Sequence, residues 1–68
     1  MDKSDEIRQE IENKLEVYEK ASLTKLQDEL SPQEQLAVLK QIKADMASEG
    51  KPKPVLQQGS DGKMYLTL

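Results

Sequence analysis

The 68-residue chain contains no cysteine and no histidine. These absences exclude disulfide bonds, thiolate nucleophiles and the commonest protein ligands of zinc. A core of this size supplies only about 3–5 kcal/mol, and natural domains of similar length usually add a disulfide, a metal or a partner. Because disulfides are excluded and the usual metal ligands are missing, we expect the chain to associate with itself or with a larger protein.

Aromatic residues and long apolar runs are also scarce. Tyr18 and Tyr65 are the only aromatic residues of the sequence, so the stacking surfaces that bind single-stranded nucleic acid are nearly missing. No apolar run approaches the length of a membrane span, about 18–20 residues. Residues 1–5 have neither the basic flank nor the apolar stretch of a secretion signal. We therefore expect a cytoplasmic protein with no membrane partner.

The net charge of −3 is unevenly distributed along the chain. Residues 1–30 carry nine acidic and five basic side chains, a net charge of −4, whereas residues 31–68 carry four acidic and five basic side chains, a net charge of +1. An acidic first half is typical of a solvated helix face. The asymmetry by itself therefore indicates no particular partner.

The residue types present do not indicate catalysis. The serines all suit structural roles as helix caps, turn residues or surface residues, and the carboxylates of Glu12 and Glu16 share a face as is ordinary on an exposed acidic helix. The run 59–63 is not a phosphate-binding P-loop, because two residues instead of four separate its glycines and Met64 replaces the Ser or Thr. A domain this small also has little room for a water-excluding cleft. We expect no enzymatic activity, no cofactor, no metal and no small-molecule ligand.

The clearest local signal is Ser31-Pro32-Gln33-Glu34, a capping box with proline at the first helical position. Apolar residues follow at helical spacing, with Val38 flanking the stripe of Leu36, Leu39, Ile42 and Met46. Gly50 can end the helix in the left-handed conformation, and Pro52 prevents its continuation. These signals predict a helix over 32–49.

The segment 5–20 is predicted to be helical because Ile7, Ile11, Leu15 and Tyr18 lie on one helical face. Leu26 would extend the same stripe, and no glycine or proline intervenes, so one helix could run to residue 30. Thr24 and Gln27 instead offer a second capping box, which predicts a break and a short helix over 25–30. Both readings remain open, and the choice between them decides the fold.

The C-terminal residues predict a β-hairpin, with strands over 55–58 and 63–68 around Gly59-Ser60-Asp61-Gly62. An Asp-Gly pair tolerates the positive φ that tight turns need. An isolated hairpin is marginal in water, so this one must pack on the helices, on a second copy or on a partner. The sequence thus predicts one small α+β domain over 1–68, mainly α, with two or three helices followed by a hairpin over 55–68.

With the break before residue 25, the order of elements resembles a winged helix-turn-helix module. Residues 23–30 resemble its short second helix, 33–46 its recognition helix and Ala47-Ser48-Glu49-Gly50 the end of that helix, and the hairpin resembles its wing. Without the break, the rival fold is a long helical hairpin with a β tail, as a monomer or a dimer, which favours protein binding.

The resemblance implies DNA binding, with the recognition helix in the major groove and the wing against the backbone. Glutamine can read adenine in the major groove, and lysine contacts phosphates. The nucleic-acid contacts that the resemblance implies are Ser31, Gln33, Gln35, Lys40, Lys43, Lys51, Lys53 and Lys63.

Protein binding is the function that the sequence favours first, because the core is thin and the last strand has an apolar face that needs cover. The interaction would be helix-in-groove packing or strand addition. The same side chains could instead pack on each other inside one monomer. The candidate contacts are Ile7, Ile11, Leu15, Tyr18, Met64, Tyr65 and Leu66. We expect a small regulatory or adaptor protein that forms a homodimer or docks on a protein partner, with a DNA-binding transcriptional regulator as the alternative.

Overall fold

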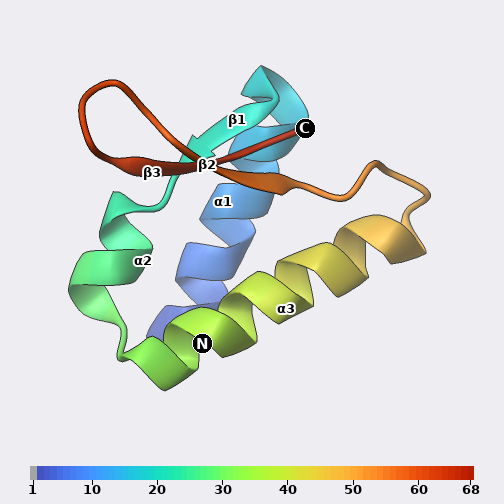
Figure 1. Cartoon of the computed structure of the whole chain (residues 1–68). Helices are drawn as coiled ribbons and strands as arrows, with labels where there is room; N and C mark the ends of the chain where they lie inside the picture. Colours follow the sequence, from blue (N-terminus) through green and yellow to red (C-terminus); the bar gives the residue numbers. More distant parts are fainter. Residues whose placement is uncertain (1) are drawn as a thin grey trace.

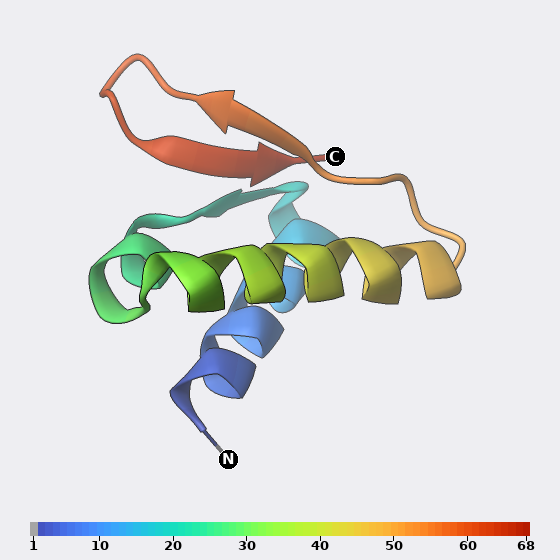
Figure 2. The same cartoon turned by 60° about the horizontal axis from the view of Figure 1, so that its bottom comes forward.

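The computed structural model describes residues 2–68, and this range contains three α-helices and one three-stranded antiparallel sheet (Figure 1). The elements are α1 Lys3–Tyr18, β1 Lys20–Ser22, α2 Thr24–Glu29, α3 Pro32–Ser48, β2 Val55–Gln58 and β3 Met64–Thr67. The helices lie on one side of the sheet (Figures 1 and 2). The predicted α+β class, mainly α with a C-terminal hairpin, is confirmed. Met1, the first residue of the predicted 1–68 domain, lies outside the described residues.

A break at Glu19 separates the first two helices. Glu19 is left-handed, with φ 60°, and its backbone N–H donates to the carbonyl of Leu15 at 3.0 Å. The chain then runs through β1 before α2 begins. The segments 5–20 and 25–30 are therefore two separate helices, each shifted toward the N-terminus by one or two residues. The rival prediction of one helix over 5–30 is wrong.

Strand β1 was not predicted from the sequence. It pairs with β3 in the register Lys20↔Thr67, Ala21↔Leu66 and Ser22↔Tyr65, and β2 pairs with the other edge of β3, which gives the strand order β1-β3-β2. Ala21 and Leu23 are both buried. Burial at every second residue is the strand pattern, but three residues are too few to reveal it in the sequence.

The two predicted capping boxes have different outcomes. At α3 the hydroxyl of Ser31 accepts the N–H of Glu34 at 3.3 Å, and the Glu34 carboxylate accepts the N–H of Ser31 at 3.1 Å. At α2 no side chain caps the helix, because α2 starts at Thr24 itself. The hydroxyl of Ser22 accepts the N–H of Thr24 at 3.2 Å instead.

One hydrophobic core joins all three helices to β1 and β3. Its members are Ile7, Ile11, Leu15, Ala21, Leu23, Leu26, Leu30, Val38, Ile42, Met46 and Leu66. The hairpin enters this core through Leu66, which is 1% exposed. The predicted need to cover the apolar face of the last strand is therefore met, at this residue, by the chain's own helices.

Candidate functional site

The outward face of α3 combines basic, amide and apolar side chains. Val38, Ile42 and Met46 turn inward at intervals of four residues. The side chains on the opposite side, called the α3 face below, are exposed; they are Gln33, Leu36, Ala37, Lys40, Lys43 and Ala44.

Leu36 is placed differently from the sequence prediction. It was assigned to the core stripe of the helix, but it is 62% exposed, and Val38 is buried instead. The buried residues Val38, Ile42 and Met46 are four apart, and each is rotated only about 40° around the helix from the one before it. Leu36 is rotated about 160° from Val38, so it lies on the opposite side of the helix. An exposed leucine thus lies on the α3 face.

The acidic side chains of the second half of the chain are bonded to the protein itself. Glu34 caps α3, and this hydrogen bonding lowers its pKa. Asp45 is bound to Arg8, and Glu49 pairs with Lys51 at 3.2 Å. In the hairpin turn, Asp61 accepts the hydroxyl of Tyr65 at 2.7 Å and a backbone N–H, which lower its pKa. None of the residues that form the α3 face is acidic.

Four lysines of α3 and the segments that follow it are exposed and make no ion pair or side-chain hydrogen bond within residues 2–68. Lys40 and Lys43 lie on the α3 face, Lys53 lies in the connection from α3 to β2, and Lys63 lies in the hairpin turn. We call them the free lysines. Figure 2 shows α3 across the front of the molecule with the hairpin above it, and α1 passing behind α3.

Arg8 fixes α3 against α1. Its guanidinium donates to the carboxylate of Asp45 on α3 at 2.8 Å and to that of Glu12 on α1 at 3.1 Å. The side chain of Arg8 is only 22% exposed. Burial raises the pKa of Glu12, and the neighbouring Asp45 raises it further, whereas hydrogen bonding with Glu12 lowers the pKa of Asp45. One cation therefore holds together two carboxylates from different helices.

Replacing Arg8 by methionine is expected to lower the free energy of unfolding at neutral pH by about 1–3 kcal/mol, because two partly buried carboxylates lose their shared donor. The loss should shrink as the pH falls below neutral, because Arg8 lowers the pKa of Glu12, and Glu12 of the variant therefore takes up a proton at a higher pH than Glu12 of the wild type. The raised pKa of Glu12 lets the folded protein bind a proton before the unfolded chain does, so this group stabilises the fold at low pH. The pKa of Asp45 is lowered, so this carboxylate stabilises the fold at neutral pH. That stabilisation is lost only at lower pH, where Asp45 becomes protonated.

Urea unfolding followed by circular dichroism at several pH values measures this effect. Lys14→Met, on the exposed surface of α1, is the matched control and should change stability by less than about 0.5 kcal/mol. If the Arg8 variant loses the same free energy of unfolding at every pH value, the account of Glu12 is contradicted.

Three of the eight predicted nucleic-acid residues have structural partners. Ser31 caps α3. The amide of Gln35 donates to the carbonyl of Leu30 at 2.8 Å, so it holds the turn between α2 and α3. Lys51 pairs with Glu49 and, at 3.7 Å, with the Glu16 carboxylate of α1. The other five predicted residues are exposed; they are Gln33, Lys40, Lys43, Lys53 and Lys63.

The predicted partner-binding residues mostly lie in the core. Ile7, Ile11, Leu15 and Leu66 are between 0% and 4% exposed. Their burial corrects the prediction that the first helix offers an apolar face to a groove, because that face already packs on α3 and the sheet. Met64 and Tyr65 are half-buried, and only Tyr18 is largely exposed.

A second exposed apolar surface lies at the edge of the sheet and was missed in the sequence. Within the described residues, β3 is the only strand that pairs with β2, so the other edge of β2 is open. Its first two residues, Val55 and Leu56, are 53% and 52% exposed. The sequence shows that Val55 and Leu56 are apolar, but only the strand order shows that they lie on an edge strand.

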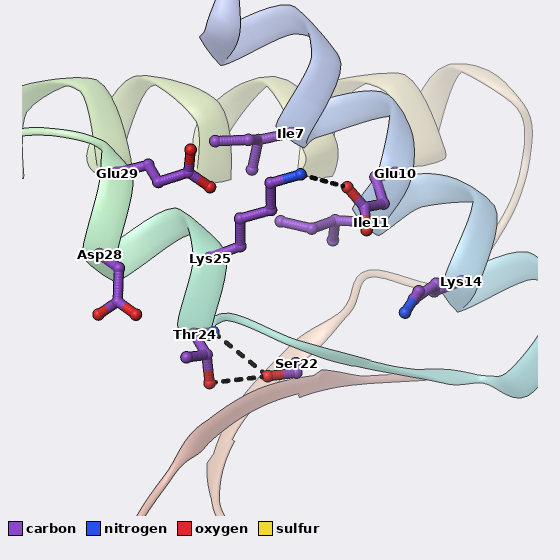
Figure 3. A pocket seen from close by; sticks show the side chains of 9 residues that line it. All are labelled: Ile7, Glu10, Ile11, Lys14, Ser22, Thr24, Lys25, Asp28 and Glu29. Atoms are coloured by element: carbon purple, nitrogen blue, oxygen red, sulfur yellow. Dashed lines mark hydrogen bonds and ion pairs between the residues drawn. The ribbon is translucent and has the colours of Figure 1, made fainter.

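A hollow of about 400 Å³ lies between α1 and α2, and Figure 3 shows the side chains that line it. Its lining residues are Ile7, Glu10, Ile11, Lys14, Ser22, Thr24, Lys25, Asp28 and Glu29. Its polar groups largely bond to one another: Lys25 pairs with Glu10 at 3.2 Å, and the hydroxyl of Ser22 bonds to Thr24. In the described part of the chain, no three His, Cys, Asp or Glu side chains are grouped to hold a metal. We therefore do not place the functional site in this hollow.

Comparisons with protein-family models, with curated proteins and with solved structures find no match. Over residues 2–68, no helix has both the length and the apolar character needed to cross a membrane. A function for this chain has to be inferred from its own residues.

Proposed function

We propose that this chain is a winged-helix-like DNA-binding module whose α3 face enters the major groove. The order of short helix, long helix and hairpin that motivated the resemblance is present as α2, α3 and β2–β3. An α-helix with its side chains is about 10–12 Å wide, which suits a major groove about 12 Å wide. The uncovered position of α3 leaves its outward face free for such a contact.

The free lysines are the observation that supports this proposal most. They combine exposed positive charge with freedom from internal ion pairs within residues 2–68, and Lys40 and Lys43 lie on the helix that would enter the groove. Lysine contacts to phosphates supply most of the sequence-independent affinity for duplex DNA. Lys53 and Lys63 add charge on the segments that follow α3.

The acidic composition of the chain is compatible with this surface because the charges are segregated. Nine of the thirteen acidic residues lie within residues 1–30, the part that forms α1, β1 and α2. Exposed charges farther apart than about 8 Å are largely screened at physiological salt. The local charge of α3 and the hairpin therefore matters more to DNA than the net charge of −3.

Titration of a labelled short duplex with the protein at several salt concentrations tests the proposal through fluorescence anisotropy. Binding is expected in the non-specific range, with dissociation constants of about 10⁻⁴ to 10⁻⁶ M. If all four free lysines contact phosphates, the logarithm of the affinity should fall with the logarithm of salt with a slope of about −3 to −4. No binding at low salt would overturn the proposal.

The open edge of β2 favours a second candidate function, self-association. The strand Val55–Gln58 carries no charge, so antiparallel pairing with β2 of a second copy would bring no like charges together. Exposed apolar side chains on such an edge promote pairing between chains.

Replacing Leu56 by lysine is expected to abolish this dimer, because a charge on an edge strand opposes pairing. Sedimentation equilibrium of the wild type and the variant measures the effect. Val17→Lys is the control, because Val17 is an exposed apolar residue on α1, and it should leave the dimer intact. A wild type that is monomeric at every concentration would remove this candidate.

A further inference from the structure

We propose that the α3 face reads A·T base pairs, with Gln33 directed to adenine and Leu36 to the methyl group of thymine. This inference rests on the proposed DNA binding and goes beyond it by naming the bases. It is based on the side chains that α3 exposes and on those that it lacks.

Leu36 is the apolar contact in this reading. It is 62% exposed, and it lies on the α3 face three residues after Gln33 and four before Lys40. Lysines on the same face would draw this leucine toward a polyanion. The C5-methyl group of thymine is the apolar feature of the major-groove floor, and apolar side chains contact it in DNA complexes.

Gln33 is the amide contact. It lies in the first turn of α3, is exposed and makes no side-chain hydrogen bond within the described range of the chain. The amide of glutamine can bond in a bidentate way to adenine, and residues near the start of a recognition helix contact base edges. Gln33 and Leu36 are about 4.5 Å apart along the helix axis and about 60° apart around it, so both can face the floor of one groove.

Arginine, one of the two side chains suited to guanine, is absent from this face. Arginine and lysine both make bidentate contacts to guanine, but Arg8 is the only arginine of the sequence and is held between Glu12 and Asp45. Acidic side chains can accept from cytosine, but Glu34 caps α3 and is not on the α3 face. Lys40 and Lys43, one and two turns beyond Leu36, suit phosphates.

Three short duplexes test the inference: one of alternating A and T, the same duplex with deoxyuridine in place of thymidine, and one of alternating G and C. Uracil lacks the methyl group but keeps the pairing edge. The wild type should bind the A·T duplex most tightly and lose about fourfold in affinity for each contacted methyl group removed. Leu36→Ala should bind the thymine and uracil duplexes equally, whereas Val17→Ala, on α1, should keep the wild-type difference.

The outcomes separate this inference from the proposed function. If the wild type binds all three duplexes equally, DNA binding stands and A·T reading is wrong. If it binds none of them at low salt, both are wrong. If Leu36→Ala keeps the full difference between thymine and uracil, Leu36 is not the methyl contact. Circular dichroism confirms that each variant is folded, which is expected because both replaced side chains are exposed.

Discussion

Replacing Lys40 and Lys43 together by glutamate is expected to abolish measurable binding to duplex DNA at physiological salt. The change removes two of the four free lysines and places two negative charges on the helix that would face the phosphates. Each lost phosphate contact should reduce the magnitude of the salt slope by about 1. The milder double change to glutamine should therefore still bind at low salt, with a slope reduced by about 2.

The matched control is Lys3→Glu with Lys14→Glu, which changes the net charge equally and places both changes on α1. Both lysines are exposed and lie outside α3 and the hairpin. If binding depends on the α3 face, the control should keep most of the wild-type affinity. Equal losses in the two double variants would show that net charge, and not the position of the lysines, governs binding.

Replacing Leu66 by alanine is expected to remove most of the free energy of unfolding and to leave the fold marginal at room temperature. Leu66 is 1% exposed and lies on the central strand β3, opposite Ala21 of β1 and Leu56 of β2. Truncating a buried leucine costs about 2–5 kcal/mol, as much as the about 3–5 kcal/mol that a core of this size supplies.

Thermal and urea unfolding, followed by circular dichroism, measure the effect of this truncation. Leu56→Ala is the matched control, since Leu56 is the register neighbour of Leu66 but is 52% exposed. Its effect should stay below about 0.5 kcal/mol. A Leu66 variant with the wild-type unfolding midpoint would mean that the hairpin contributes nothing to the core.

Elements that depend on local chemistry could be predicted closely from the sequence. The start of α3 at Pro32 follows from the bonds between Ser31 and Glu34, which need only neighbouring residues. The hairpin turn follows from Gly62, which has the positive φ of 81° expected of an Asp-Gly turn. Such signals act within a few residues, so they can be recognised without knowing the rest of the fold.

Features that depend on distant residues could not be predicted. β1 exists because β3, near the other end of the chain, pairs with it. The candidate site shows the same limit. Gln35 is occupied because α2 ends beside it, and Leu36 is exposed because Val38 meets the core instead. The resemblance names the free lysines among its DNA contacts, but the sequence could not show which of the lysines form ion pairs within the chain.

Amide chemical shifts of the labelled protein, recorded by NMR with and without a short duplex at low salt, test most directly whether α3 is a DNA-binding surface. The account predicts shifts centred on Gln33, Leu36, Lys40 and Lys43, with smaller shifts at Lys63, all reversed as salt rises. An unchanged spectrum, or shifts confined to α1 or to the β2 edge, would contradict it.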